Sequence, residues 1–182
     1  MEDENPLEAK EKLEELAEHK SGWTRYLALT TAIVAVLAAL ASMKSGALAN
    51  DALLAKNDAI LNQSKASDQW NYYQAKGIKR TIDEGLSLIH SNKKLSNGAS
   101  REGAEQKDVQ KKAEDLDKAV ETDNALSEQL LQRHEKAATS VTFFQIAIAL
   151  AAMAALMRQK LYWFFSMGLA VAGTVFLILC WI

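Results

Sequence analysis

The chain has few of the residues that usually form metal, redox or catalytic sites. It contains one cysteine, Cys180, so no disulfide can form within the chain. Its three histidines, His19, His90 and His134, are far apart in the sequence. It contains no P-loop, dinucleotide-binding glycine pattern, zinc-spaced Cys/His set or HExxH motif. We therefore expect no catalytic residue, no cofactor and no bound metal, and predict that the protein is not an enzyme.

Proline is equally scarce, and its single position is informative. Asn5-Pro6 predicts the start of a helix, with Asn5 as the cap and Pro6 in the first helical position. Residues 44–140 contain no proline and almost no strand pattern, and they are rich in Ala, Leu, Lys, Glu and Gln, which favour helix. The predicted fold class is all-α.

Charge is missing from three long stretches. Residues 26–43, 137–157 and 161–182 contain no Lys, Arg, Asp or Glu, and they are 18, 21 and 22 residues long. A helix of about 20 apolar residues crosses the roughly 30 Å hydrocarbon core of a bilayer. In lipid, each such segment must satisfy its own backbone hydrogen bonds, which favours helix. The sequence therefore predicts an all-α membrane protein with three transmembrane helices.

Basic residues beside these stretches predict the orientation. Lys20 and Arg25 precede the first stretch, and Arg158-Gln159-Lys160 joins the second to the third. The positive-inside rule places both groups in the cytoplasm, which leaves residues 44–140 in the periplasm of a bacterial inner membrane. Cations also flank the opposite face, but segments longer than about 60 residues translocate largely regardless of their charge.

These boundaries divide the chain into five parts. The first 25 residues carry eight acids against four Lys or Arg, and Ser21-Gly22 predicts a break after a short amphipathic helix. This acidic helix either lies solvated beside the membrane or docks onto a partner. The predicted parts are the acidic helix at 1–22, a transmembrane helix at 23–43, an extramembrane antiparallel helical hairpin at 44–140 with a polar loop at about 92–103, and transmembrane helices at 141–157 and 161–182.

The two arms of the expected hairpin differ in their apolar pattern. The second arm repeats every seven residues in two registers, as in a coiled-coil seam, whereas the first is less regular. Ala, Ser, Asp and His hold seam positions where a stable coil has Leu or Ile, so a lone hairpin buries little apolar surface. We therefore expect the arms to pack against copies of themselves in a homo-oligomer. The registers are Val109, Leu116, Asp123, Leu130 and Ala137, and Ala113, Val120, Ser127, His134 and Val141; the first arm offers Leu53, Ile60, Trp70, Tyr73, Ile78, Ile82, Leu86 and Ile89.

One run in the first arm is more distinctive than any other. It reads Asp68-Gln69-Trp70-Asn71-Tyr72-Tyr73-Gln74-Ala75-Lys76-Gly77. On a helix, Trp70, Tyr73 and Gly77 share one face, so a second helix can approach closely at the glycine while two large rings fill the space beside it.

This run is similar to that of the DUF4337 family, bacterial membrane proteins of unknown function. Its members have one leading span, a charged helical region with a D-Q-W-x-x-Y-Q-A-K signature, and a closing pair of spans. The resemblance extends over nearly the whole chain and implies no activity. It implies a family role for seven residues, either as a packing or oligomer contact or in recognising a small ligand or peptide. They are Asp68, Gln69, Trp70, Tyr73, Gln74, Ala75 and Lys76.

Small residues recur at four-residue spacing in the apolar stretches, a pattern that brings transmembrane helices close together. Gln145 is a polar residue there that can hydrogen-bond between helices. Part of this set can join the three spans of one subunit and part can join subunits. The small residues are Ala35, Ala39, Ala147, Ala151, Ala155, Gly168 and Ala172.

The predicted function is that of an oligomeric membrane scaffold or assembly protein. Its partners are the lipid bilayer, further copies of the chain, and a protein held by the hairpin or the N-terminal helix. Nucleic acid is not expected, because the charged regions are neutral or acidic. A homo-oligomeric channel or transporter subunit is the first alternative, although the spans contain no ionisable group of the kind that ion-coupled carriers use. A transmembrane sensor is the second.

Overall fold

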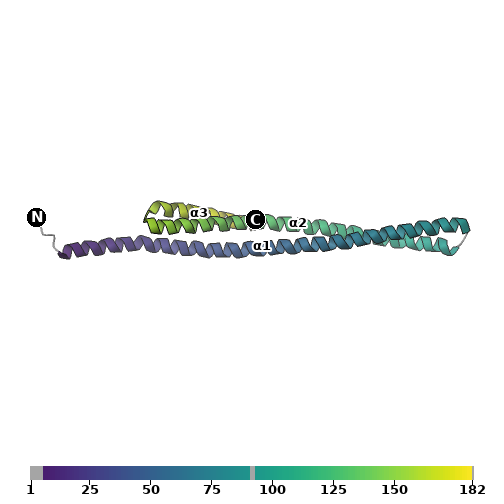
Figure 1. Ribbon diagram of the computed structural model, residues 1–182, viewed down its shortest axis with the longest axis horizontal. Helices are drawn as coiled ribbons and strands as arrows, with labels where there is room; N and C mark the ends of the chain where they lie inside the picture. The colour runs from purple at the N-terminus through teal and green to yellow at the C-terminus, as the bar shows by residue number, and fades with distance from the viewer. Residues whose placement is uncertain (1–5, 91–92, 182) are drawn as a thin grey trace. The chain divides into compact units, whose positions relative to one another are not determined.

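A computed structural model describes residues 6–90 and 93–181, apart from the side chains of 6–9 and 13–21 (Figure 1). Over these residues the chain forms three α-helices: α1 at Pro6–His90, α2 at Lys93–Met157 and α3 at Lys160–Leu179. No described residue belongs to a strand. The predicted all-α fold class is therefore confirmed.

Two expected breaks are helical instead. α1 continues through Ser21-Gly22, and α2 begins at Lys93, so residues 93–103 of the expected loop are helix; residue 92 lies outside the described residues. A glycine inside a helix costs only about 1 kcal/mol relative to alanine, which strong helix formers on both sides can offset. In α2, a Cβ on Gly98 would stand 3.2 Å from Asp83 Oδ2, so tertiary contact with α1 also supports this segment.

The connection between α2 and α3 is short. α2 ends at Met157 and α3 begins at Lys160. Arg158 has a φ of 52°, in the left-handed region that commonly ends a helix. Gln159 follows in an extended conformation, with φ −110° and ψ 121°. The chain therefore reverses here without a glycine.

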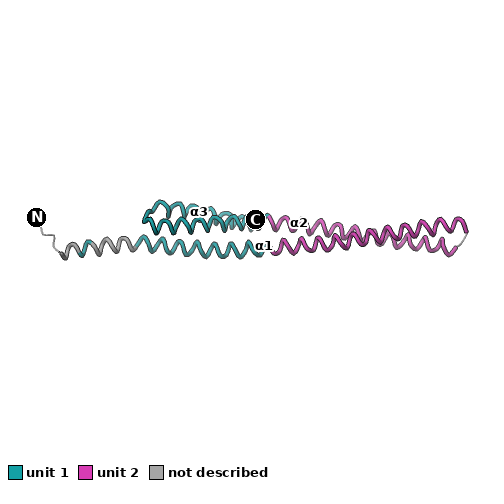
Figure 2. Tube along the Cα trace, viewed as in Figure 1, with its two compact units in different colours: residues 1–48, 132–182 teal, residues 49–131 magenta. Residues whose placement is uncertain are grey.

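The residues form two compact units (Figure 2). Unit 1 comprises residues 1–48 and 132–182, and unit 2 comprises residues 49–131. Segments of α1 and α2 belong to both units, whereas α3 belongs to unit 1 alone.

Unit 1 contains the apolar stretches. Each of the three helices includes a stretch long and apolar enough to cross a membrane. Polar side chains link the helices: Ser166 Oγ of α3 donates a hydrogen bond to the Ala147 carbonyl of α2 at 2.7 Å, and Trp163 Nε1 of α3 donates to Thr30 Oγ1 of α1 at 3.1 Å. The main buried cluster draws on all three helices and consists of Val34, Ala41, Phe144, Ala147 and Ala170.

In unit 2, segments of α1 and α2 contact each other in antiparallel order. Ser127 Oγ donates to the Ala52 carbonyl at 2.9 Å, and Asn62 Nδ2 donates to Asp123 Oδ2 at 2.9 Å. The residue numbers of the contacts rise along α1 as they fall along α2. All ten residues of the two predicted α2 registers are buried or half-buried across the two units.

The α1 side of this contact differs from the expectation. Alanines, not the large aliphatic residues of the first arm, face α2 in unit 2. Of the eight residues that the sequence offered for this seam, only Trp70 and Tyr73 are half-buried, while six are exposed. Alanine permits two helices to approach closely, and leucine or isoleucine in those positions would hold them apart. The buried alanines of unit 2 are Ala52, Ala55, Ala59, Ala66, Ala99 and Ala113.

Candidate functional site

The distinctive run of α1 directs several of its side chains toward α2. Trp70 Nε1 donates a hydrogen bond to Asp117 Oδ2 at 2.9 Å. The Trp70 and Tyr73 rings meet edge to face, with centroids 5.6 Å apart and planes at 79°. This is a preferred arrangement for aromatic pairs, because the positive edge of one ring faces the negative face of the other. One turn of helix thus supplies both a ring pair and a polar link to α2.

Gly77 allows a close contact with α2. A Cβ at this position would stand 2.7 Å from Gln106 Nε2, closer than ordinary packing permits. The same Gln106 amide donates to the Tyr73 carbonyl at 3.3 Å. The glycine therefore leaves room for a glutamine that bonds to the α1 backbone four residues earlier.

Beside these contacts lies a group of charged residues, the Lys76–Glu102 cluster, made of Lys76, Lys79, Arg101, Glu102 and Glu105. Lys76 Nζ lies 2.7 Å from Glu102 Oε2 and also pairs with Glu105. Lys79 Nζ donates to Glu102 Oε1 at 2.6 Å. Arg101 lies farther out, with its NH2 nitrogen 3.9 Å from Glu102 Oε1. Glu102 is the most buried member at 1% exposure, so the cations of α1 surround a carboxylate of α2.

Both central members of the cluster are held in their charged forms. Hydrogen bonds from Lys76, then from Lys79, lower the pKa of Glu102 to about 2. Hydrogen bonds to Glu102 and Glu105 raise the pKa of Lys76 above its ordinary value. In both cases partial burial opposes the shift but is outweighed by the hydrogen bonds. The cluster lies between only two helices, so solvent remains close to it. Its ion pairs hold the α1 and α2 segments together but do not form a site that excludes water. Neither group is suited to exchange protons near pH 7.

The remaining residues of the run do not contact α2 in this way. Asp68, Gln74 and Ala75 are exposed, and Gln69 is half-buried. The structure therefore divides the seven signature residues between the α2-facing side of α1, with Gln69, Trp70, Tyr73 and Lys76, and its exposed side, with Asp68, Gln74 and Ala75.

The partners of Lys76 were not predicted from the sequence. Glu102 and Glu105 fell in or beside the expected loop, where acids are ordinarily solvated. A signal was present: Glu102, Gln106, Val109 and Ala113 continue the four-three spacing of the α2 seam toward its start. Extending that seam by two turns would have placed a carboxylate opposite a lysine of α1.

The small residues of the apolar stretches also divide into two sets. Ala147 and Ala151 are buried within unit 1, and Ala172 is half-buried. The others, together with Gln145, are exposed on the unit: Ala35, Ala39, Ala155 and Gly168.

The close approach of α3 in unit 1 occurs at a glycine that the spacing pattern did not include. A Cβ on Gly173 would stand 2.9 Å from Phe144 Cε1 and 3.3 Å from Phe143 Cβ. By contrast, a Cβ on Gly168 would meet no atom within 4 Å.

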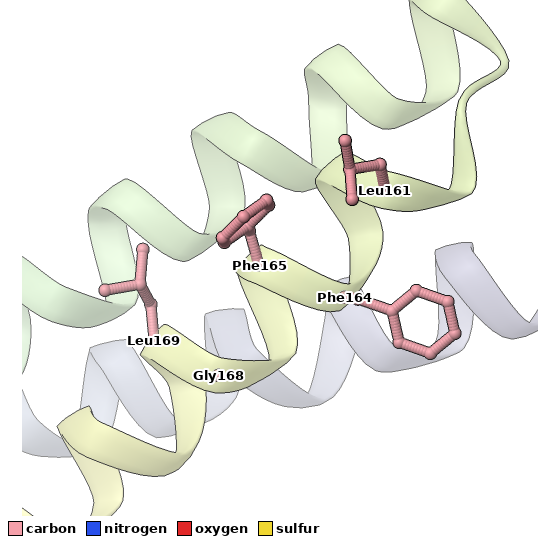
Figure 3. A pocket seen from close by; sticks show the side chains of 5 residues that line it. All are labelled: Leu161, Phe164, Phe165, Gly168 and Leu169. Carbon is pink, nitrogen blue, oxygen red and sulfur yellow. The ribbon is translucent and has the colours of Figure 1, made fainter.

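An open hollow lies on the outer surface of α3 (Figure 3). Its lining comes from one face of the helix and is apolar throughout. Phe164 and Phe165 are 63% and 61% exposed, so the hollow is shallow. Its lining has no polar side chain to orient a ligand, as a binding pocket typically does. The lining residues are Leu161, Phe164, Phe165, Gly168 and Leu169.

The histidines provide one contact between helices. His134 Nδ1 lies 2.9 Å from the Ser45 carbonyl oxygen and 3.0 Å from Ser45 Oγ in unit 1. Because a carbonyl only accepts, a proton on Nδ1 satisfies this geometry. His90 is exposed, and the side chain of His19 lies outside the described residues. Within the described part of the chain, no three His, Cys, Asp or Glu side chains are grouped so as to hold a metal ion.

Comparison with known proteins gives a match to a protein family. No curated protein and no solved structure matches the chain. The model of a domain of unknown function, DUF4337, matches residues 23–182, from the first apolar stretch to the last. That range includes the signature run, both acids that pair with Lys76, and all three apolar stretches. The chain belongs to the DUF4337 family.

Proposed function

We propose that this protein is a non-enzymatic membrane scaffold that self-associates. Its three apolar stretches would cross a bacterial inner membrane, and the antiparallel segments of α1 and α2 would form a coiled-coil-like hairpin outside it. The hairpin would present a surface to further copies of the chain and to a partner protein.

Membrane embedding is supported by length and charge. All three helices contain a stretch that satisfies the length and composition of a span. The turn between the last two carries Arg158 and Lys160, which favours a cytoplasmic position for that turn and for the N-terminus. Unit 2 would then lie in the periplasm.

One observation carries the scaffold proposal: in unit 2, α1 turns alanines toward α2 and leaves its large aliphatic residues exposed. Buried alanines lie between the helices, while Leu53, Ile60, Ile78 and Ile82 are 55–64% exposed. Burying a large aliphatic side chain is worth about 1.5–3 kcal/mol, so exposing several on one helix is unfavourable in water. A surface of this kind typically marks an interaction site.

The test is extraction of the full chain from native membranes into lipid particles, followed by counting every polypeptide in the particle by native mass spectrometry. We expect the chain to remain with the membrane after a high-salt wash and to appear in two or more copies per particle. Recovery of the intact chain in the soluble fraction, or one copy per particle, would refute the proposal.

The same preparation distinguishes the proposed scaffold from the two alternatives, a channel and a sensor. Reconstituted into liposomes, a scaffold leaves the flux of small solutes at the level of empty vesicles. Selective flux that falls on Gln145→Ala, but not on Gln69→Ala outside the spans, would replace the scaffold with a channel. A ligand-dependent change in protease access to the N-terminal residues, without flux or self-association, would replace it with a sensor.

A further inference from the structure

On α1 in unit 2, a row of exposed, uncharged residues runs from Leu53 to Ile89, with large aliphatic residues toward both ends and serine and asparagine between them; we call it the outer stripe. Its large members Leu53, Ile60, Ile78, Ile82 and Ile89 are 61%, 61%, 64%, 55% and 75% exposed. At about 100° per residue, the side chains of an α-helix two positions apart point roughly 200° apart. The outer position 57 lies two residues from both Ala55 and Ala59, which face α2. The outer stripe therefore lies opposite the α2 contact, and both faces can be used at once.

The spacing of the outer stripe is that of a second coiled-coil seam. Its positions follow alternating steps of four and three residues, interrupted by one extra step of four between Asn71 and Ala75. Every one of these positions is exposed and none is charged. They are Leu53, Asn57, Ile60, Ser64, Ser67, Asn71, Ala75, Ile78, Ile82, Gly85 and Ile89.

The exposed surface of α2 in unit 2 is different. Among its described residues, only Leu126 and Leu131 are large, apolar and exposed, and the surface is rich in Lys, Asp and Glu. The two helices of the pair thus expose contrasting surfaces. This difference is explained if water contacts the exposed surface of α2 while another surface packs against the exposed surface of α1.

We propose that the outer stripe packs against the outer stripe of a second copy, parallel and in register. This inference rests on the proposed membrane function, because copies inserted in one membrane in one orientation must run in the same direction. An uncharged stripe meets its own copy without repulsion. Asn57 and Asn71 occupy seam positions, where a buried asparagine fixes the register of parallel coils, since each amide can bond to its own copy.

The size of the outer stripe fits this partner. From residue 53 to residue 89, at 1.5 Å per residue, it is about 54 Å long. At a width of roughly 10 Å it offers on the order of 540 Å², against the roughly 800 Å² per partner of a stable interface. Exposed faces of the spans, including Gly168, are available for the remainder. The stripe therefore suits a membrane-anchored partner better than a soluble one.

Cysteine crosslinking in native membranes tests the pairing. In a Cys180→Ala background, Ile60→Cys and Ile82→Cys each place one thiol on the outer stripe, and Leu126→Cys places one thiol on the exposed surface of α2. Parallel, in-register pairing brings each stripe thiol beside its own copy, within the short range that a disulfide requires. We expect mild oxidation to give homodimers with both stripe variants and not with the control.

Four results would overturn the pairing. An antiparallel arrangement would link an Ile60→Cys copy to an Ile82→Cys copy instead of linking like to like. A disulfide to a different polypeptide would assign the stripe to another partner. Crosslinks at Leu126→Cys alone, in a protein that is oligomeric by mass, would refute the stripe while leaving the scaffold intact. A wild-type chain that is a single copy by mass would refute both.

A second variant measures how much the stripe contributes. Ile82→Glu places a charge within the proposed interface, yet the side chain points away from α2, so helicity should be unchanged. We expect self-association to weaken by roughly tenfold or more, as loss of a buried isoleucine implies. Leu126→Glu is the matched control and should leave it unchanged. Equal self-association of the two variants would contradict the proposal.

Discussion

The contact between Gly173 and Phe144 gives the sharpest test of packing in unit 1. Gly173 is buried, and a Cβ there would stand 2.9 Å and 3.0 Å from Phe144 Cε1 and Cδ1. Carbon atoms in favourable contact are about 3.5–4.0 Å apart, so the ring or the helix must move by roughly 0.5–1 Å in a Gly173→Ala variant. Phe144 has no exposed surface, and Phe143 Cβ lies 3.3 Å from the added carbon. The ring therefore has little room to yield.

Gly168→Ala is the matched control, because it lies in the same helix and its Cβ would meet nothing within 4 Å. Both substitutions gain about the same helix propensity, up to about 1 kcal/mol. Their difference isolates the cost of overpacking, typically about 1–3 kcal/mol. We expect Gly173→Ala to be less stable than Gly168→Ala by that amount.

The measurement is reversible unfolding of each full-length variant in mixed detergent micelles, followed by helicity against the fraction of denaturing detergent. The order of the two midpoints is the decisive quantity. Equal midpoints, or a Gly173→Ala variant more stable than its control, would refute the packing of α3 against Phe144.

Three further changes test single contacts. Glu102 has a pKa of about 2 in the folded chain against an ordinary 4.5, so the stability that its carboxylate contributes is lost as the pH falls from 4.5 to about 2. A Glu102→Gln variant should lack this pH-dependent loss of stability. Identical curves of helicity against pH for the variant and the wild type would contradict the prediction. Trp70→Phe keeps a ring but removes the donor to Asp117, which should cost about 1 kcal/mol or less in chemical unfolding, and an unchanged midpoint would show that the bond contributes nothing. Arg158→Gly relieves the positive φ and should stabilise by about 1 kcal/mol in the same assay, whereas Gln159→Gly should not; an equal effect of the two would reject the strain.

The sequence alone determined the helical character and the three apolar stretches. Both follow from local properties: helix-forming residues in every segment, a lack of proline after Pro6, and charge-free runs of sufficient length. The α2 seam was also readable, because its side chains recur every seven residues, whatever they pack against. Even its weak members, Asp123 and His134, are half-buried.

Helix ends were less accessible to the sequence. Gly22, Gly98 and Gly103 resemble breaks, yet each costs about 1 kcal/mol at most and is tolerated inside a long helix. For Gly98 and Gly103, side chains of α1 lie within 3.4 Å of where a Cβ would be. Local propensity cannot include that contact.

Only the tertiary structure decided which face of α1 turns toward α2. The helix has two faces with coiled-coil spacing, and the larger apolar residues favoured the wrong one. Ala52, Ala55 and Ala59 are inside because the helices come close enough to bury a methyl group, whereas Leu53 and Ile60 remain outside. The pairing of Lys76 with Glu102, 26 residues later in the sequence, depends on the same choice. The spacing of residues in the sequence shows which of them share a helix face. The distance between the two helix axes determines which face has side chains small enough to fit between the helices.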